Sequence, residues 1–206
     1  MPPLIRYLGM AEYQPTFEAM RAHNRATNES TPDELWLLEH PSTFTQGLAG
    51  KSEHILSAGN IPVVKIDRGG QVTYHGPGQL VIYLMLNMRG RNFGVKSLVM
   101  RLEQSVIDLL AEYGITSGRQ TGMPGVYVVT DGVVAKIAAI GLRVANHATY
   151  HGLSLNINMD LEPFSRINPC GYAGLATTQL SALGVRDNTQ VVGEKLLTHM
   201  KANLYG

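Results

Sequence analysis

Cysteine is almost absent from this sequence: Cys170 is the only one among 206 residues. A single cysteine excludes an internal disulfide and indicates a reducing compartment, so we expect a cytoplasmic protein. No apolar run approaches the roughly 18 residues that a membrane span needs. Residues 1–6 also lack the basic stretch and apolar core of a signal peptide. We therefore expect neither a leader nor a membrane partner.

Net charge is also nearly absent. The chain has 17 Lys and Arg against 16 Asp and Glu, a net charge of +1, and this balance predicts no nucleic-acid partner. Acidic residues are, however, missing from three windows, 68–102, 132–159 and 163–186. The basic residues of these windows are Arg68, Arg89, Arg91, Lys96, Arg101, Lys136, Arg143, Arg166 and Arg186. If they converge they form a positive region that attracts an acidic partner, and if they do not they are scattered surface charges; the sequence leaves both open.

Hydrophobic residues make up 44% of the chain, enough for a sizeable core, and their spacing predicts both helices and strands. Apolar residues at steps of three and four predict helices over residues 13–28, 95–113 and 189–205. Short aliphatic runs predict strands or extended segments over residues 4–8, 34–39, 61–66, 80–86, 125–129, 133–144 and 150–158. Residues 40–47 and 68–80 are expected to be loops.

The tripeptide Thr130-Asp131-Gly132 between two of these strands is a strong hairpin signal. Strands that pair through hairpins, with helices between groups of them, indicate an α+β fold with a mixed β-sheet flanked by helices. The chain contains no linker, low-complexity segment or repeat period. We therefore expect one domain over residues 1–206.

The segment 68–80 combines glycine with many hydrogen-bonding side chains. Four of its thirteen residues are glycine, which lets a backbone turn sharply and approach a ligand closely. Its neutral polar residues are Gln71, Thr73, Tyr74, His75 and Gln79. This composition predicts a ligand-binding loop, and a decorated turn is the alternative. The tetrapeptide Thr-Tyr-His-Gly occurs at 73–76 and again at 149–152, which chance, shared turn geometry or two polar loops lining one cavity would explain.

Lys136 and Cys170 stand out because their side chains are reactive. Lys136 is the only charged residue of the run 133–142, and strand alternation places it on the face of Val134, Ala138 and Ile140. Its ammonium group either extends to water or lies desolvated, where it is chemically useful. Cys170 lies between proline and glycine with no acidic neighbour, a context in which a thiolate is favoured and accessible. From the residues alone, a nucleophile and a structural cysteine are about equally supported.

Together these stretches resemble the octanoyltransferase family, a branch of the biotin/lipoate protein ligase superfamily. The resemblance extends over residues 40–174 with its motifs in the correct order. The motifs are Arg-Gly-Gly-Gln-Val-Thr-Tyr-His-Gly-Pro-Gly-Gln-Leu at 68–80, Lys-Ile-Ala-Ala-Ile-Gly at 136–141 followed by Thr-Tyr-His-Gly at 149–152, and Asn-Pro-Cys-Gly at 168–171. The first motif is long and highly specific.

The resemblance implies a biotin/lipoate ligase-like catalytic domain of the α+β class and an acyl transfer reaction. Members of this family move an octanoyl group from an acyl carrier protein to a lysine of lipoyl domains, through a thioester on a cysteine. Cys170 corresponds to that nucleophile and Lys136 to its activating partner. The residues that correspond to the acyl-binding walls are Arg68, Gly69, Gly70, Gln71, Val72, Thr73, Tyr74, His75, Ala139, Ile140, Gly141, Gly152, Leu153 and Ser154. The implied partners are octanoyl-acyl carrier protein, the lipoyl domains of 2-oxoacid dehydrogenase complexes and the glycine cleavage H protein.

The chemistry of such a transfer is consistent with the residues present. Exchange between two thioesters is nearly isoenergetic and thioester to amide runs downhill, so we expect no cofactor and no metal. Glycines at 69, 70, 141 and 152 and alanine at 139 would leave room for a slender alkyl chain. Basic residues would help to dock an acidic carrier, and the candidates are Arg89, Arg91, Lys96 and Arg101.

Three alternative functions remain at this stage. An ATP-dependent lipoate ligase would share the fold but would give the cysteine no role. A cysteine hydrolase would use His75 or His151 as base and release free acid. A binding module without catalysis would keep its function after Cys170→Ala.

Overall fold

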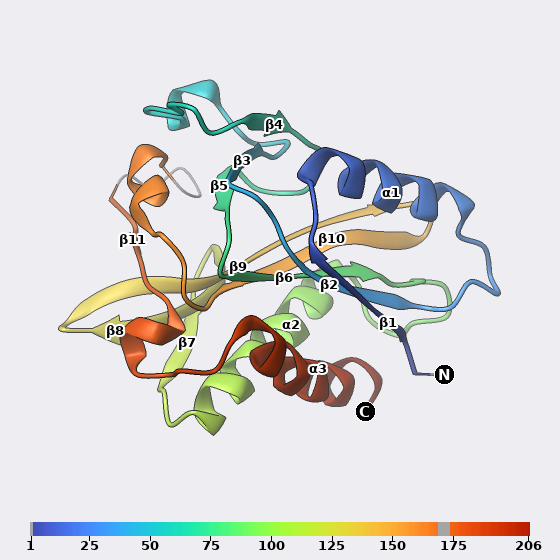
Figure 1. Cartoon of the computed structure of the whole chain (residues 1–206). Coiled ribbons are helices and arrows are strands. Elements are labelled where there is room, and N and C mark those ends of the chain that lie inside the picture. The colour runs from blue at the N-terminus through green and yellow to red at the C-terminus, as the bar shows by residue number, and fades with distance from the viewer. Residues whose placement is uncertain (1, 169–173) are drawn as a thin grey trace.

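The structure is a computed structural model that describes residues 2–168 and 174–206. Within these residues a mixed eight-stranded sheet has the order β1-β2-β6-β10-β9-β8-β7, with β11 paired to β9 (Figure 1). Its strands are β1 (Leu4–Met10), β2 (Glu34–Glu39), β6 (Gln79–Met85), β7 (Ser117–Gln120), β8 (Met123–Thr130), β9 (Val133–Ala145), β10 (Ala148–Asn156) and β11 (Ala176–Thr177). The β1–β2 and β11–β9 pairs are parallel, and the other neighbours are antiparallel.

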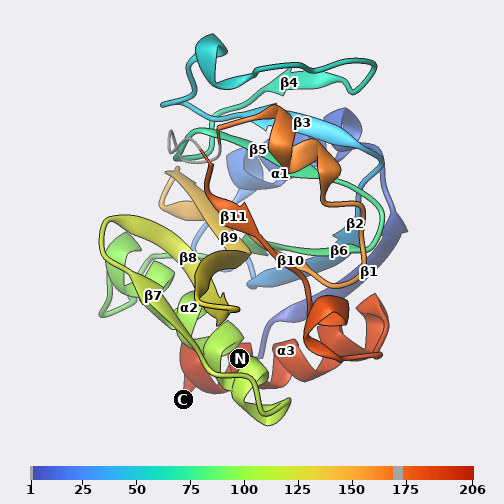
Figure 2. The same cartoon turned by 90° about the vertical axis from the view of Figure 1, so that its left-hand side faces the viewer.

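A second, three-stranded sheet has the order β4-β3-β5. Its strands are β3 (Thr43–Gln46), β4 (Val63–Lys65) and β5 (Val72–His75). The α-helices of the described residues are α1 (Tyr13–Ala26), α2 (Val95–Glu112) and α3 (Thr189–Tyr205), and the 3-10 helices with printed bounds are η1 (Ser52–His54), η2 (Glu162–Arg166) and η4 (Leu180–Leu183). Helices α2 and α3 cover one face of the large sheet, while α1 and the small sheet lie over the other (Figures 1 and 2).

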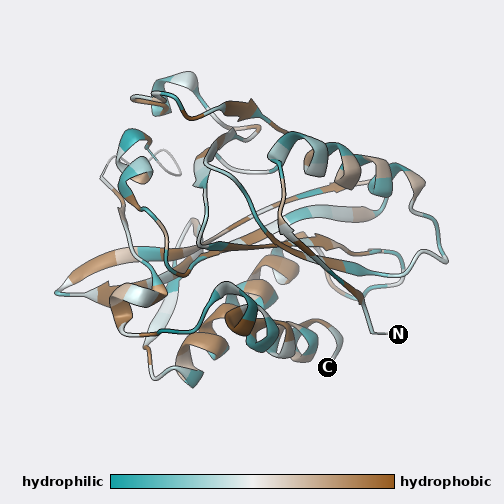
Figure 3. Cartoon of the chain, viewed as in Figure 1, coloured by the Kyte–Doolittle hydropathy of each residue, from teal (hydrophilic) through white to brown (hydrophobic). Residues whose placement is uncertain are grey.

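The central strand β6 is buried on both faces, which explains why its sequence is a continuous apolar run. Leu80, Ile82 and Leu84 face α2 and α3 in the largest core cluster. The alternate residues Tyr83 and Met85 belong to a second cluster under α1. Colouring by hydropathy shows the same distribution, with brown central strands and a brown inner side of α2 (Figure 3). The large sheet therefore separates two cores.

The predicted helices and the central hairpin are confirmed. The observed helices α1, α2 and α3 agree with the predicted spans to within about two residues at each end. Strands β8 and β9 are joined by Asp131 and Gly132, which both have positive φ (52° and 77°), as a two-residue hairpin turn of the primed type requires. In the part of the chain that the structure describes, no helix combines the length and the apolar character needed to cross a membrane.

The prediction that residues 40–47 and 68–80 are loops is wrong in part. Strand β3 lies within the first of these segments and β5 within the second, and the two pair with each other antiparallel. Both strands are short and partly polar, so neither carries a clear local signal. The short strands β7 and β11 were not predicted from the sequence either. Pairing of β3 with β5 holds the glycine-rich segment over the large sheet.

Candidate active site

A cavity of about 410 Å³ lies between the glycine-rich segment and strands β9 and β10. That volume is within the range of pockets that hold small-molecule ligands. The segment 68–73 forms one wall, residues 136–142 and 152–154 form another, and Val95 and Val99 of α2 contribute a third side. The cavity therefore brings together the first two motifs singled out in the sequence.

The residues expected to bind the acyl group line this cavity, with one exception. Those at its wall are Arg68, Gly69, Gly70, Gln71, Val72, Thr73, His75, Ala139, Ile140, Gly141, Gly152, Leu153 and Ser154. Tyr74 is not among the lining residues. Its ring packs against Phe44 and Phe164, with 5.5 Å between ring centroids in each pair, and its hydroxyl lies 2.9 Å from Ser42 Oγ. Alternation along β5 turns Tyr74 away from the side that its neighbours Thr73 and His75 present.

Arg68 fixes the glycine-rich segment to the small sheet. Its buried guanidinium donates from Nη2 to Thr45 O (2.9 Å) and Thr45 Oγ1 (3.0 Å), and from Nη1 to Gly69 O (2.9 Å). The backbone N–H of Gly69 donates to Leu142 O on β9 at 3.0 Å. The guanidinium therefore acts as a structural brace, and it holds the wall of the cavity close to β9.

Packing leaves little room for a Cβ at two of the glycines, independently of any ligand. A Cβ at Gly152 would lie 2.0 Å from Ile82 O on the neighbouring strand. A Cβ at Gly141 would lie 2.9 Å from Arg68 Cδ and 3.3 Å from Gly69 O. At Gly69 the nearest atom to an added Cβ would be Leu142 O at 3.4 Å, an ordinary contact. Close packing of backbone and side chains is thus enough to explain why glycine occupies positions 141 and 152, without a bound alkyl chain.

Lys136 lies on the opposite face of β9 from the one that simple alternation predicts. The β8–β9 register shifts between Val126 and Tyr127, which pair with Ala138 and Lys136, so one residue of β9 is unpaired. This β-bulge puts both Ile137 and Ala138 into the core under α2. Lys136 consequently shares a face with its partner Tyr127, and the prediction that it shares a face with Ala138 and Ile140 is wrong.

The ammonium group of Lys136 does not extend to solvent. The residue is 5% exposed, its Nζ donates to Pro124 O at 3.0 Å, and Nζ lies 5.2 Å from the ring centroid of Tyr127. Both the carbonyl and the ring face compensate for lost hydration. Of the two interpretations of Lys136 that the sequence leaves open, the structure supports the desolvated one.

Cys170 lies outside the described residues, but the chain on both sides of it is placed. Before it, the N–H of Asn168 donates to His54 O at 2.8 Å. After it, β11 runs parallel to β9 with Thr177 opposite Lys136, and the N–H of Thr178 donates to Lys136 O at 3.0 Å. The described chain that follows residue 173 therefore contains a strand that pairs with β9 beside Lys136.

Beneath the cavity, on the α1 side, lie three buried histidines. His40 contacts Ala11 O through Nδ1 (2.6 Å) and the Tyr83 hydroxyl through Nε2 (2.7 Å), while His75 Nδ1 lies 2.7 Å from Gln79 Oε1. Burial lowers the pKa of His40 to about 4 and, with a contribution from the His40 charge, lowers that of His75 to about 3. These two imidazoles are neutral at physiological pH and are weak bases.

His151, the third of these histidines, is 1% exposed and has φ of 60°, a left-handed backbone that only a minority of non-glycine residues adopt. It lines the cavity together with His75, so the two copies of the repeated tetrapeptide do contribute to one cavity. Tyr13 and Tyr83 also line it, and sequence reasoning missed both. A tyrosine within the apolar run of β6 is the signal that could have identified Tyr83, because a buried hydroxyl requires a partner.

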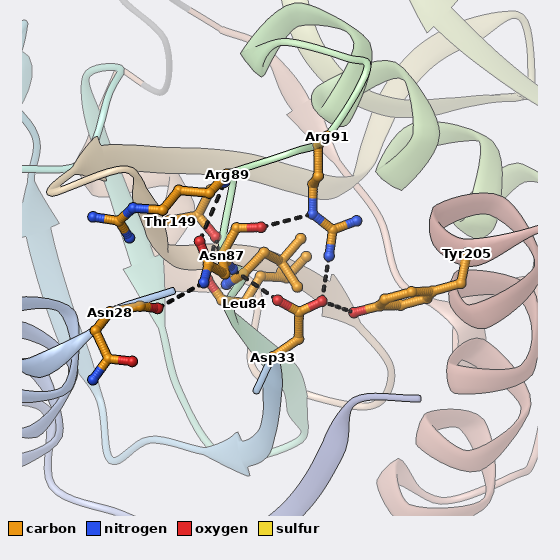
Figure 4. A network of polar contacts seen from close by, with 9 residues as sticks. Asn28, Asp33, Leu84, Asn87, Arg89, Arg91, Thr149 and Tyr205 are labelled. Carbon is orange, nitrogen blue, oxygen red and sulfur yellow. Dashed lines mark hydrogen bonds and ion pairs between the residues drawn. The ribbon is translucent and has the colours of Figure 1, made fainter. Parts of the chain in front are cut away.

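The basic residues of the window 68–102 do not form one open surface. Arg91 forms an ion pair with Asp33 and donates to Asn87 O at 2.9 Å, and the Tyr205 hydroxyl also donates to Asp33 (Figure 4). The Arg101 guanidinium donates to Asn203 O. Lys96, at the start of α2, is exposed. Arg91 and Arg101 are thus structural residues that connect α3 to the rest of the chain.

The whole fold is similar to that of a solved bipartite lipoate protein ligase from Thermoplasma acidophilum. The TM-score is 0.78 at 15% identity, and the match covers 100% of this chain and 84% of the other. At that identity the likeness establishes the fold: the protein has a lipoate ligase-like domain of the α+β class.

Sequence comparison identifies the family. The lipoyl protein ligase A/B catalytic domain matches residues 13–201. An octanoyltransferase of Laribacter hongkongensis is 54% identical over 200 residues, which are 97% of this chain and 95% of the relative. An octanoyltransferase of Chromobacterium violaceum is 55% identical over 204 residues, 99% and 97% of the two chains. The chain belongs to the lipoyl protein ligase A/B family, among its octanoyltransferases, and is an acyltransferase that moves an octanoyl group in lipoate biosynthesis.

Proposed function

We propose that this enzyme takes its octanoyl group from octanoyl-acyl carrier protein and delivers it to a lysine of lipoyl domains, through a thioester on Cys170. The acceptors would be lipoyl domains of 2-oxoacid dehydrogenase complexes and the glycine cleavage H protein. The observation that carries the proposal is Lys136, a buried amine at the cavity wall. The strand that follows Cys170 is paired with the backbone beside it. Only six residues lie between Cys170 and Thr177 in the sequence.

In the first half-reaction the sulfur of Cys170 attacks the carbonyl carbon of the carrier thioester. A new C–S bond forms, the carbon–sulfur bond to the carrier breaks, and the carrier leaves as a thiol. The Cys170 proton passes through Lys136 Nζ to the departing sulfur. Thiols are suited to this role because a thioester holds an acyl group and still releases it to an amine.

In the second half-reaction the amine of the acceptor lysine attacks the Cys170 thioester. An amide bond forms, the carbon–sulfur bond to Cys170 breaks, and the amine proton passes through Lys136 to the Cys170 sulfur. The free enzyme is thereby regenerated. A positioned amine in contact with the reacting atoms contributes general acid–base catalysis in both directions.

The cavity wall suits an alkyl chain. Val81, Val95, Val99, Ile140 and Leu153 supply apolar surface within a volume of about 410 Å³. Burial of each methylene contributes about 0.8 kcal/mol, so a closed cavity of fixed length favours eight carbons over six by about 1.6 kcal/mol. The enzyme should therefore prefer octanoyl over shorter chains without excluding them.

The buried histidines argue against the hydrolase alternative. His75 has a pKa of about 3 because of burial, and the pKa of His151 is also lowered by burial. His75 is therefore a poor proton acceptor near neutral pH, and burial weakens His151 as a base in the same direction. The ligase alternative differs in its need for ATP.

Intact-mass measurement tests the proposal. Incubation with octanoyl-acyl carrier protein, without ATP, should add the mass of one octanoyl group to the wild-type enzyme and nothing to Cys170→Ala. A lipoyl domain added afterwards should remove that mass from the enzyme and gain it on one lysine. A requirement for ATP would favour a ligase, and release of free octanoate without an acceptor would favour a hydrolase. Transfer by Cys170→Ala at the wild-type rate would refute the thioester.

A further inference from the structure

A carboxylate is buried in the apolar face of α2, close to strand β8. This strand carries Pro124, whose carbonyl accepts a hydrogen bond from Lys136. Glu103 is 5% exposed and lies in the helix between Leu102 and Val106, which belong to the main core. Burial of a carboxylate costs free energy unless it is paired and hydrogen-bonded. Arg119 on β7 supplies the pair, with 2.9 Å between Arg119 Nε and Glu103 Oε2.

The second oxygen of this carboxylate binds a particular peptide group. The backbone N–H of Gly125 donates to Glu103 Oε1 at 2.9 Å, in a buried contact. The same peptide unit carries the carbonyl of Pro124, which accepts from Lys136 Nζ at 3.0 Å. One peptide group thus connects the Glu103 carboxylate on one side with the Lys136 ammonium on the other. A charge on the N–H side polarises the carbonyl and strengthens its hydrogen bond to an ammonium.

The backbone around this peptide is shaped for the contact. Gly125 has φ of 132°, which side chains rarely adopt, and a Cβ there would lie 2.9 Å from Lys136 Cε and 2.5 Å from Ala138 O. The Tyr127 hydroxyl donates to Met123 O at 3.1 Å, which braces the strand on the other side of Pro124. The Pro124 carbonyl is thereby held toward β9.

We propose that Glu103 is a positioning residue for Lys136, acting through the Pro124–Gly125 peptide. The inference rests on the proposed role of Lys136 in the transfer. Glu103 orients the carbonyl, and the carbonyl fixes Nζ at the cavity wall, where Lys136 would serve the proposed transfer. Arg119 neutralises Glu103 but makes no contact with the peptide group among the hydrogen bonds of the described residues.

Arg119 therefore provides a matched control. Glu103→Ala and Arg119→Gln break the same ion pair, but only Glu103→Ala releases the peptide group. We expect Glu103→Ala to lower kcat/KM for octanoyl transfer about tenfold, the effect of a misplacement well below 1 Å. It should also move the pH profile of iodoacetamide labelling of Cys170 in the same direction as Lys136→Ala does. Arg119→Gln should lower the melting temperature and leave kcat/KM within about threefold of wild type, because it acts only through stability.

A double variant separates an effect of Glu103 on the position of Lys136 from an effect on folding. When Lys136→Ala is already present, Glu103→Ala should cause no further shift of the labelling profile, because contacts that act through one group are not additive. If Glu103→Ala does not fold, Glu103→Gln carries the test, since its amide oxygen still accepts from Gly125 while the negative charge is lost. Glu103→Gln should shift the labelling profile in the same direction as Lys136→Ala, by a smaller amount, and should cause no further shift when Lys136→Ala is already present.

Two results would overturn the inference in distinguishable ways. In the first, Glu103→Ala shifts the labelling profile equally in the wild-type enzyme and in Lys136→Ala, or Glu103→Ala and Arg119→Gln lower kcat/KM equally. Glu103 would then be a purely structural residue, and the proposed function would stand. A Lys136→Ala enzyme with the wild-type labelling profile would refute the role of Lys136, and the inference with it.

Discussion

Nε2 of His151, a residue that lines the cavity, lies 3.1 Å from Asp67 Oδ1. A carboxylate only accepts hydrogen bonds, so the ring carries its hydrogen on Nε2 and Nδ1 is an acceptor. Nδ1 is buried without a hydrogen-bond partner among the described residues. Burial lowers the pKa of His151 despite the carboxylate. His151 is thus the third buried histidine, after His40 and His75, whose pKa is lowered by burial.

The buried histidines predict a loss of stability in mild acid. His40 and His75 have pKa values of about 4 and about 3, below their ordinary value of 6.5. The unfolded chain therefore binds more protons between pH 6.5 and pH 4, and the free energy of unfolding falls as pH falls through this window. The slope that each of the two contributes should grow as pH falls below 6.5 and reach at most about 1.4 kcal/mol per pH unit. Urea denaturation at pH 7.0, 6.0 and 5.0 measures it.

A pair of variants tests which histidines cause that slope. His40→Gln should reduce the slope by up to about 1.4 kcal/mol per pH unit, even if it lowers stability at pH 7. His147 is exposed and has φ of 55°, a backbone that asparagine tolerates, so His147→Asn should leave the slope unchanged. Equal slopes for wild type and His40→Gln would show that the pKa of His40 is the same in the folded and the unfolded chain.

The difference between prediction and structure follows the difference between local and non-local interactions. Helices α2 and α3 and the β8–β9 hairpin were predictable because their apolar spacing and turn residues are encoded within each segment. Strands β3 and β5 were not, because each is stabilised by pairing with the other across about 30 residues.

The site shows the same limit. The motifs identified the segments that line the cavity, because glycine, histidine and lysine in those patterns are unusual. One β-bulge reversed the face of β9 on which Lys136 lies relative to Ala138 and Ile140. A prediction from strict alternation assumes that every residue of the strand is paired, so it fails where one residue is unpaired. The contacts of Glu103 with Gly125 and of Asp67 with His151 join residues far apart in sequence. Local sequence patterns therefore do not predict them.

The glycines of the cavity wall are predicted to differ sharply in their tolerance of a side chain. Gly152→Ala should destabilise the chain by about 3 kcal/mol or more, because its Cβ would overlap Ile82 O on the next strand. Gly69→Ala should cost less than about 1 kcal/mol, because the nearest atom is at 3.4 Å. Thermal melts of both variants make the comparison. A Gly152→Ala variant as stable as Gly69→Ala would mean that β10 and β6 can separate locally.

Gly141→Ala should affect the reaction through Arg68. Its Cβ would lie 2.9 Å from Arg68 Cδ, and displacement of that side chain would move the wall formed by the glycine-rich segment. We expect a shift of acyl preference toward shorter chains with a fold that is intact by circular dichroism. Competition between hexanoyl and octanoyl carrier thioesters measures the preference. Loss of all activity without a change of preference would instead indicate that Arg68 itself is needed.

Lys96 is the exposed cation best placed to guide an acidic carrier. It lies at the start of α2, beside Val95 and within one turn of Val99, and both of these line the cavity. Lys96→Glu should raise KM for the carrier substrate several-fold and weaken its dependence on salt, because an exposed charge acts on encounter. Arg25→Glu reverses an exposed charge of α1, on the other face of the sheet (Figure 1), and should leave KM unchanged. The same KM for wild type and Lys96→Glu at low salt would exclude docking through this residue.

The last prediction concerns Lys136 and Cys170 as a reacting pair. A neighbouring cation lowers the pKa of a thiol and increases its thiolate fraction at neutral pH. Lys136→Ala should therefore slow labelling of Cys170 by iodoacetamide at neutral pH and move its pH profile to more alkaline values. Lys136→Arg keeps the positive charge, but a guanidinium does not give up its proton. It should preserve part of the labelling rate while transfer to the acceptor lysine is lost.

The contrast between these two variants separates the two roles of the amine. If the charge alone matters, the arginine enzyme transfers octanoyl at a rate that follows its labelling rate. If proton transfer matters as well, labelling and octanoyl transfer separate in the arginine enzyme, with acyl-enzyme accumulating in intact-mass spectra because the second half-reaction lacks its proton acceptor. Identical alkylation profiles for wild type and Lys136→Ala would refute the pairing. The contacts of Lys136 with Pro124 and Tyr127 would then serve only to satisfy a buried ammonium group.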